Sequence, residues 1–297
     1  MILSKVSRKF SETLDATKTV DIISALVTKV TKHSLLESLY IYKYFQHYYS
    51  YIVVDKATKN MISFDCGDFK TSRFNVEKLM KETGGGFEYL FLTHGHPNHI
   101  QGALEWQRIH PDLKICGGQE FFGGMKVVKD GDIFFVGDLS VYCMHTPGHT
   151  PYDFSYVVTE ASETSDKTPF VFTGDTLYIG GCGPVVSGTY GDLYASLKKL
   201  KTLPNETMIF PGHENALENL TYAKLLEQKN EFIENKLEWA KQNKGNMTVG
   251  SVMSEERLYN PFLRSDQKYF QNLTGETDPV KCFEKMRKVM EKLIEQK

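Results

Sequence analysis

Five of the nine histidines in this chain of 297 residues follow apolar runs or stand in Gly/Pro turns, where distant side chains can meet. They are His94, His96, His99, His149 and His213. Asp175, just after the apolar run FVFT, adds a carboxylate. Imidazole nitrogens with a carboxylate suit zinc, iron or manganese, and the absence of thiolates from the set argues against a closed structural zinc site. We therefore predict a catalytic metal.

The elements that must position these residues are strands. The run YLFL leads into His94, FVFT leads into Asp175, and TMIF leads into His213. Buried strands of α/β folds tend to present their carboxyl ends at one edge of the sheet, where loops converge. Runs rich in β-branched and aromatic residues predict strands at 51–54, 61–64, 89–92, 132–136, 154–158, 170–173 and 207–210.

Helical patterns such as NVEKLMKET and HIQGALEWQRIH separate several of these strands, which makes the fold class α/β. From about residue 219 onward the pattern of apolar residues changes from short strand-like runs to helical spacing. Apolar residues recur with a period of 3.6 between 222 and 240 and again between 280 and 293. The last quarter of the chain is therefore expected to be mostly helical.

Composition excludes some classes of function. The formal charge of −2 gives no whole-chain attraction to nucleic acid, so nucleic acid is not an expected partner. No apolar run reaches the about 18 residues of a membrane span. The five cysteines never form a CxxC pair, which favours reduced thiols and a cytoplasmic location. Cys182 has no base placed against it by the sequence, so we expect a loop near the substrate there and not a nucleophile.

Six motifs occur in a characteristic order: THGHPNH, TPGHT, FTGDTLYIGGCG, PGHE, YNPFLR and GETDP. Together they resemble glyoxalase II, the hydroxyacylglutathione hydrolases of the metallo-β-lactamase superfamily. The resemblance covers roughly residues 40 to 290. Its last two motifs lie in the helical C-terminal part that distinguishes glyoxalase II from its relatives.

The resemblance implies a metallo-β-lactamase four-layer αββα sandwich with a C-terminal helical domain. The expected organisation is an N-terminal helical extension at 1–38, a metallo-β-lactamase domain at 39–215 and a helical substrate-binding domain at 216–297. The resemblance also implies two metal sites. His94, His96 and His149 would hold the first ion, His99 and His213 the second, and Asp175 would bridge both.

The implied reaction is hydrolysis of S-(2-hydroxyacyl)glutathione, such as S-lactoylglutathione. A metal-bound hydroxide would attack the thioester carbonyl and release a 2-hydroxy acid and the free thiol. The partner is thus a small-molecule glutathione thioester, and neither nucleic acid nor a membrane is expected.

Asn98 departs from the family pattern, which has Asp at this position as a ligand of the second metal. A neutral amide oxygen can coordinate, but it holds a dication less firmly than a carboxylate. We expect one tightly held zinc and a weaker second site, with iron or manganese as alternatives, and we assign catalytic roles to Asp175 and Asn98. The other interpretation of Asn98 is a helix N-cap ahead of HIQGALEW.

The family's glutathione contacts are also thinned. The matching positions read Pro184, Val186, Asn215, Arg287 and Met290, and only Arg287 agrees with the family. Lys288 or Lys292 could replace the lost lysine from a neighbouring helical position, or could be ordinary surface charge. Arg287 and Lys288 are therefore the candidate substrate-binding residues.

Two other functions stay open. Persulfide dioxygenases of the same superfamily hold a single iron with two histidines and one aspartate, which His94, His149 and Asp175 could supply. The helical tail argues against this, because those relatives look shorter there. The third hypothesis is a binding protein that kept the fold and lost the reaction.

Overall fold

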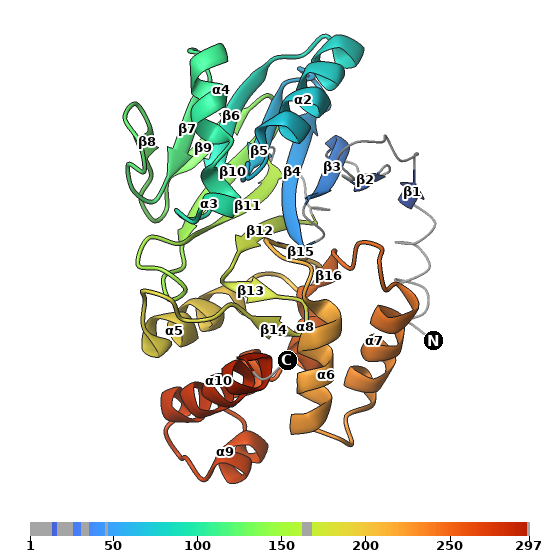
Figure 1. Ribbon diagram of the computed structural model, residues 1–297, viewed down its shortest axis with the longest axis vertical. Helices are drawn as coiled ribbons and strands as arrows, with labels where there is room; N and C mark the ends of the chain where they lie inside the picture. The colour runs from blue at the N-terminus through green and yellow to red at the C-terminus, as the bar shows by residue number, and fades with distance from the viewer. Residues whose placement is uncertain (1–13, 17–25, 31–35, 45–46, 162–167, 296–297) are drawn as a thin grey trace. The chain divides into compact units, whose positions relative to one another are not determined.

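The computed structural model describes residues 14–16, 26–30, 36–44, 47–161 and 168–295 (Figure 1). The chain divides into two compact units, which are described separately below. Unit 1 comprises 1–128, 132–142 and 158–167, and unit 2 comprises 129–131, 143–157 and 168–297.

Unit 1 is built on an eight-stranded sheet whose strand order is the order of the chain. Its strands are β1 (Leu14–Ala16), β2 (Leu26–Val30), β3 (Leu36–Tyr44), β4 (Tyr48–Asp55), β5 (Met61–Phe64), β6 (Phe87–Leu92), β7 (Lys114–Gly117) and β8 (Lys126–Val127). Neighbours from β1 to β5 are antiparallel, and those from β5 to β8 are parallel. Parallel neighbours need crossover connections, and helices supply two of them.

The helices of unit 1 are α2 (Phe69–Thr83), α3 (Pro97–Ile100) and α4 (Ala103–Ile109). Helix α2 begins at Asp68, whose carboxylate accepts from the Thr71 N–H at 2.8 Å, and ends at Gly84 in the left-handed conformation. The fully buried Trp106 of α4 donates to the Ser72 hydroxyl at 2.9 Å, so α4 is tied to α2 within the core. This core fixes the carboxyl ends of β5 and β6, where the first set of candidate residues lies.

Three further strands follow in the chain: β9 (Ile133–Val136), β10 (Leu139–His145) and β11 (Phe154–Glu160). Strand β9 and residues 139–142 of β10 pair antiparallel within unit 1. Residues 143–145 and 154–157 belong to unit 2, so β10 and β11 each have residues in both units.

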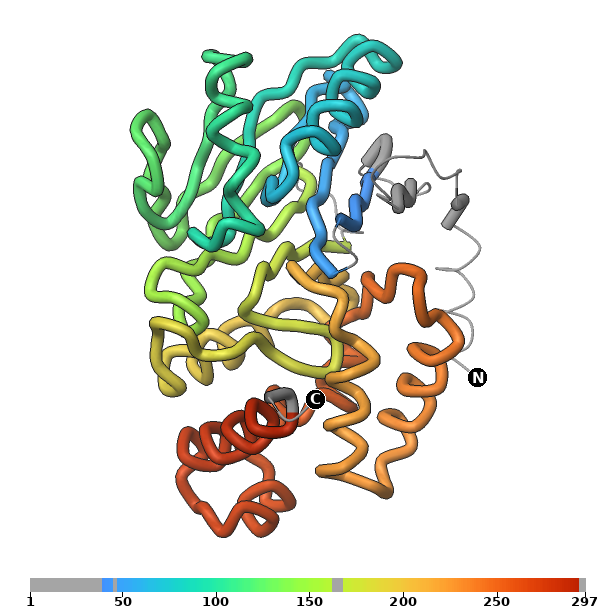
Figure 2. Tube along the Cα trace, in the orientation of Figure 1, coloured from blue at the N-terminus to red at the C-terminus, as the bar shows by residue number. Residues whose placement is uncertain are grey.

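Unit 2 contains the parallel pair β12 (Phe170–Gly174) and β15 (Met208–Pro211), and β16 (Ser251–Val252) is antiparallel to β15. A small ribbon of β13 (Leu177–Tyr178) and β14 (Gly181–Cys182) follows β12. Most of the remaining chain is helical, as Figure 2 shows. The helices are α5 (Tyr190–Leu200), α6 (Ala216–Leu226), α7 (Glu231–Gln242), α8 (Met253–Tyr259), η1 (Phe262–Arg264), α9 (Lys268–Thr274) and α10 (Pro279–Glu295). Helix α6 packs on α7, and α10 packs on α5 and α9.

The strands expected from the sequence are confirmed. Each of the seven expected runs overlaps one of β4, β5, β6, β9, β11, β12 and β15. The two helical patterns of the last quarter are confirmed as α6, α7 and α10.

The expected helical extension at 1–38 is not what the described residues of that segment form. Residues 14–16, 26–30 and 36–38 are strand, and the rest of the segment lies outside the described residues. The physical reason lies in pairing with partners along the chain. Strand β2, with the sequence LVTKV, pairs along the length of β3. Backbone pairing with a neighbouring strand therefore determines the structure of this β-branched segment, and local helix propensity does not.

Candidate metal centre

The carboxyl ends of β5 and β6 place Asp65 beside the segment that begins at Thr93. The pairing of Phe64 with Phe91 continues through a hydrogen bond from the Asp65 N–H to the Phe91 carbonyl at 2.9 Å. The buried Asp65 carboxylate accepts from the Thr93 N–H at 2.8 Å and from its hydroxyl at 2.9 Å. Asp65 has φ of 58°, a left-handed conformation that Asp tolerates better than most residues.

Asp65 also fixes the ring of His99, because His99 Nδ1 lies 2.7 Å from the Asp65 Oδ2 atom. A carboxylate accepts only, so the Nδ1 atom carries the proton and the lone pair of His99 is on Nε2. Metal-binding histidines are typically oriented in this way by a second partner.

His94 is oriented by the same network. Its Nδ1 lies 3.1 Å from the Thr93 hydroxyl, which already donates to Asp65 and so accepts from His94. The lone pair of His94 is therefore on Nε2, which lies 2.9 Å from His96 Nδ1. Two ligand atoms on one tetrahedral zinc lie about 3.3 Å apart, from Zn–N distances of about 2.0–2.1 Å, so this spacing is close to that of a shared ion.

Asn98 is the second residue of α3 and is half-buried. Its backbone carbonyl accepts from the Tyr44 hydroxyl at 2.5 Å, and a Cβ at Gly67 would collide with that carbonyl. The N-cap interpretation of Asn98 is wrong, because His96 precedes the first turn of α3 and Gly102 precedes α4. Pro97 occupies the first turn, where its missing N–H has no cost, so the helix starts before Asn98.

In unit 2 the parallel strands β12 and β15 end side by side, because Gly174 pairs with Pro211. The Gly212 N–H donates to the Gly174 carbonyl at 2.8 Å, so Asp175 and His213 leave the same sheet edge. His213 Nε2 lies 3.0 Å from the Asp175 Oδ2 atom. The register of two parallel strands thus brings together two residues that are far apart in the chain.

His149 joins this group from the turn that follows β10. Its Nε2 atom lies 3.5 Å from Asp175 Oδ2, while its Nδ1 donates to the Pro184 carbonyl at 2.7 Å. Pro184 follows Gly183, where a Cβ would collide with the Asp175 backbone carbonyl. Gly183, the last glycine of GGCG, therefore lets the loop approach the Asp175 backbone closely enough for the Pro184 carbonyl to orient His149.

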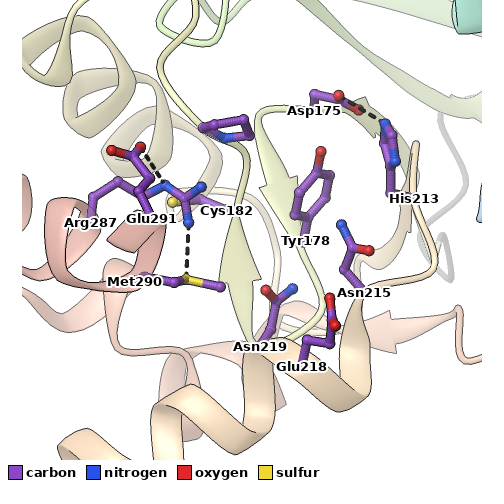
Figure 3. A pocket seen from close by; sticks show the side chains of 11 residues that line it. Asp175, Tyr178, Cys182, His213, Asn215, Glu218, Asn219, Arg287, Met290 and Glu291 are labelled. Carbon is purple, nitrogen blue, oxygen red and sulfur yellow. Dashed lines mark hydrogen bonds and ion pairs between the residues drawn. The ribbon is translucent and has the colours of Figure 1, made fainter. Parts of the chain in front are cut away.

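A pocket of about 390 Å³ lies beside Asp175 and His213 in unit 2 (Figure 3). Its lining includes Tyr178 from the β13–β14 ribbon and side chains from α6 and α10. Asn215, just before α6, also lines it. Helix α6 contributes Glu218 and Asn219, and α10 contributes Arg287, Met290 and Glu291. The pocket has the size and position of a substrate site next to candidate metal ligands.

Arg287, one of the two candidate substrate-binding residues, is 2% exposed and lines the pocket. Its Nε atom lies 3.3 Å from Glu291 Oε1, and its Nη1 atom donates to the Met290 sulfur at 2.9 Å. Lys288 is not among the residues that line the pocket. Its Nζ lies 2.5 Å from Glu284 Oε1 on the exposed side of α10.

Burial controls the ionisation of two pocket residues. Burial raises the pKa of Tyr178 well above its usual value, and the charge of Asp175 raises it further. Burial also raises the pKa of the Cys182 thiol to about 12. Both side chains are therefore protonated at neutral pH, and Cys182 is a poor nucleophile, as the sequence suggested.

The YNPFLR motif supports the ribbon that carries Tyr178. Asn260 donates to the carbonyls of Tyr178 at 3.3 Å and Gly181 at 3.0 Å. The fully buried Glu256 accepts from the Gly180 N–H at 3.0 Å and from Asn260 at 2.9 Å. The motif of the helical region thus holds one wall of the pocket in place.

Sequence reasoning missed one supporting residue in unit 1 and several pocket residues in unit 2. They are Asp65, Tyr178, Glu218, Asn219 and Glu291. Asp65 had a usable signal, since it directly follows the predicted strand MISF, as Asp175 follows the strand FVFTG. The pocket residues from α6 and α10 had none, because their approach depends on how helices distant in sequence pack.

Comparison with known proteins places the chain in a class. A model of the metallo-β-lactamase superfamily matches residues 46–213, which is more than half of the chain. A second model, of the C-terminal region of hydroxyacylglutathione hydrolases, matches residues 214–293. The chain belongs to the hydroxyacylglutathione hydrolase, or glyoxalase II, family within that superfamily.

Individual relatives agree. A hydroxyacylglutathione hydrolase-like protein of Gallus gallus is 34% identical over 244 residues, 80% of this chain and 84% of the relative. The cytoplasmic hydroxyacylglutathione hydrolase of Arabidopsis thaliana is 33% identical over 248 residues, 82% of this chain and 93% of the relative.

Among solved structures, ETHE1 from Myxococcus xanthus is 25% identical with a TM-score of 0.56, covering 83% of this chain and 86% of that one. A metallo-β-lactamase from Staphylococcus aureus has a TM-score of 0.58 at 19% identity, covering 85% of this chain and 71% of that one. The expected fold class, a metallo-β-lactamase fold followed by a helical C-terminal region, is confirmed. Among the described helices, none is long and apolar enough to cross a membrane.

Proposed function

We propose that this protein hydrolyses S-(2-hydroxyacyl)glutathione thioesters such as S-lactoylglutathione, releasing a 2-hydroxy acid and glutathione. The observation that carries the proposal is the pairing of both family regions in one chain, the second matched over residues 214–293. A pocket of about 390 Å³ beside Asp175 and His213 supports it, because a thioester needs room for its thiol half next to the reacting centre.

We further propose that the metal ligands are His94, His96, His149, His99, His213 and Asp175, with Asn98 as a weak ligand. The donor set fits zinc, with iron or manganese as alternatives. The tautomers support this, because His94, His99 and His149 all have a partner at Nδ1 that places the lone pair on Nε2. When bound, the ions supply a water with a lowered pKa and polarise the thioester carbonyl.

The chain's own residues orient the proposed ligands and line the pocket beside them. Asp65 and Pro184 hold imidazoles in the orientation that ligation needs. Tyr178 presents a protonated phenol beside Asp175 in the lining of the pocket. Cys182 stays protonated, so the attack on the carbonyl falls to water and no thioester exchange onto the protein is expected.

One experiment tests the reaction class. Purified protein of measured metal content is incubated with S-D-lactoylglutathione and, separately, with glutathione persulfide, while thioester loss and oxygen uptake are followed. Thioester loss without oxygen uptake is the expected result. Oxygen uptake with the persulfide would indicate a dioxygenase instead, and binding of either compound without turnover would indicate a binding protein.

We also propose domain boundaries and a location. The boundary near 215/216 is supported by the two family matches, which meet at residues 213 and 214. A cytoplasmic location is supported by the name of the Arabidopsis thaliana relative and by five cysteines that are all free in the structure.

A further inference from the structure

The phenol of Tyr178 lies where the pocket of unit 2 adjoins two of the proposed metal ligands. Tyr178 lines the pocket together with Asp175 and His213, and its ring centroid lies 5.6 Å from that of His213. Figure 3 shows the phenol oxygen directed toward Asp175, whereas Glu218 and Asn219 lie near the other end of the Tyr178 side chain. The Tyr178 hydroxyl is therefore at the end of the pocket where the reacting carbonyl must bind.

The position of this hydroxyl is fixed by the protein. Tyr178 is 4% exposed and pairs with Gly181 in the β13–β14 ribbon. The Asn260 amide donates to the Tyr178 carbonyl at 3.3 Å, and the Thr173 hydroxyl donates to the neighbouring Leu177 carbonyl at 2.7 Å. A side chain that is already held in place loses little conformational freedom when a ligand binds, so it can discriminate between ligands that differ by one hydrogen bond.

A phenol is a suitable partner for an alcohol group of a ligand. The phenol O–H donates and the phenol oxygen accepts, and an alcohol has the same two capacities. Tyr178 can therefore share a hydrogen bond with an alcohol whichever of the two supplies the proton. Its oxygen keeps acceptor capacity while its proton is used in the hydrogen bond to the Asp175 side chain. This pairing needs no net charge in the pocket.

The acyl half of the proposed substrates carries such an alcohol next to the reacting carbon. The thioester carbonyl must lie beside Asp175 and His213 to react at the proposed ligands. The carbon that bears the 2-hydroxyl is bonded directly to the carbonyl carbon, about 1.5 Å away. The 2-hydroxyl therefore stays at the same end of the pocket as the Tyr178 phenol.

We infer that Tyr178 is a specificity-determining residue that binds the 2-hydroxyl of the acyl group and so favours 2-hydroxyacyl thioesters over simple acyl thioesters. The inference rests on the thioester hydrolysis proposed above and deepens it, because it assigns recognition of the acyl half to one residue. Recognition of the glutathione half is a separate matter, since the same thiol is present in each pair of compounds compared below.

The test uses S-D-lactoylglutathione and S-propionylglutathione, which differ only in the 2-hydroxyl. The kcat/KM of each is measured with the wild-type holoenzyme and with Tyr178→Phe. The ratio of the lactoyl to the propionyl value should fall about fivefold in Tyr178→Phe, as expected for one hydrogen bond between uncharged groups. A loss of folded protein or of metal lowers both values alike and cancels in the ratio, so a purely structural role of Tyr178 would leave the ratio unchanged.

Tyr194→Phe is the matched control, because it removes the same hydroxyl from another tyrosine of unit 2. Tyr194 lies on α5 with its ring centroid 6.0 Å from that of Phe283, and it is not among the residues that line the pocket. It should leave the ratio unchanged. Equal ratios in the wild type and Tyr178→Phe would overturn the inference, and so would an equal fall in Tyr194→Phe.

Binding separates this inference from the proposed reaction. S-(2-hydroxypropyl)glutathione and S-propylglutathione differ by the same hydroxyl and have no thioester to hydrolyse. Titration of the wild-type holoenzyme should show about fivefold tighter binding of the hydroxypropyl compound, and Tyr178→Phe should abolish this preference. The wild-type titration stays decisive where Tyr178→Phe fails to fold, because equal binding of the two compounds overturns the inference. Failure of both thioesters to react contradicts only the proposed function.

Discussion

At the scale of single residues, the orientation of two imidazoles, those of His94 and His99, depends on Asp65. This one buried carboxylate accepts from both Thr93 donors and from His99 Nδ1, and the Thr93 hydroxyl in turn accepts from His94. Two proposed ligands therefore share a single supporting residue. Such supporting residues typically change metal affinity or activity by about 10–100-fold when mutated.

We predict that Asp65→Asn lowers metal content and activity by about tenfold or more, because an amide puts an N–H where two donors and an imidazole N–H now converge. Metal per protein after dialysis and the rate of thioester loss measure the effect. Asp112→Asn, at an exposed position of the same unit, should leave both unchanged. Full metal content and activity in Asp65→Asn would show that Asp65 has no supporting role.

A second prediction concerns Asn98. We expect one ion to survive dialysis and a second to be partly lost, and we expect Asn98→Asp to raise both the retained metal and the thioesterase rate, since a carboxylate attracts a dication more strongly than an amide. Metal analysis paired with initial rates provides the measurement. An unchanged or lower rate at matched metal content would mean that the amide is adapted to its role.

The histidines could be found from the sequence because each stands next to a local signal, an apolar run or a Gly/Pro turn. Asp65 offered only half of that signal, since a single carboxylate after a strand is common. Arg287 was found through the family resemblance, but its partner Glu291 was not. Their contact depends on both side chains turning toward one pocket, which helical spacing alone does not determine.

At the scale of elements, the helical region of unit 2 is held together by an ion pair. Arg264 binds Glu227 with both guanidinium branches, at 2.5 and 3.0 Å, and its side chain is 10% exposed. Although burial alone would raise the pKa of Glu227, the hydrogen bonds from Arg264 and Asn230 lower it below its ordinary value. The pair links the 3₁₀ turn η1 to the end of α6.

Arg264→Gln should therefore lower the free energy of unfolding by about 2 kcal/mol at neutral pH, the typical size for hydrogen bonds to charged groups. Because the folded pKa of Glu227 is lowered, the stabilisation is present above the ordinary glutamate pKa and disappears as pH falls through the lowered value. Urea unfolding at pH 7 and near pH 3 measures both quantities.

Lys285→Gln supplies the comparison, since Lys285 pairs with Glu276 at 3.5 Å on an exposed surface. Exposed pairs contribute little, so its unfolding free energy should change by less than about 1 kcal/mol. Equal effects of the two substitutions would contradict the structural role of Arg264.

Periodicity predicted the long elements well and the short ones poorly. Strand β5 coincides with the expected run 61–64, where all four residues are buried and three of them are apolar. The four-residue helix α3 is too short for a period, so the start of the helix was misjudged at Asn98. In the first 38 residues we expected a helix, but β2 is a strand that pairs with β3. This pairing joins two separate segments, so the pattern of one segment alone could not predict it.

At the scale of the whole molecule, the α/β class and the helical last quarter followed from the sequence, whereas the division into two units did not. Residues of β10 and β11 belong to both units, so the chain passes between the units several times. Compact units depend on contacts between distant segments, of which the sequence shows no local trace.

The reactivity of the cysteines tests whether their thiols are buried throughout the chain. All five cysteines are buried and free, and burial raises the pKa of Cys66, Cys116 and Cys182 to about 12. At pH 8 the thiolate fraction of these groups is roughly a thousandfold lower than that of an ordinary exposed thiol.

We therefore predict that a thiol reagent such as 5,5′-dithiobis(2-nitrobenzoate) reacts with none of the five cysteines of the native protein within minutes at pH 8. In denaturant all five should react rapidly, because unfolding exposes each thiol to solvent and returns its pKa to the ordinary value. The release of the coloured thiolate counts reactive cysteines in both states. Rapid labelling of one or more thiols without denaturant would contradict their burial, and peptide mapping would identify which unit had opened.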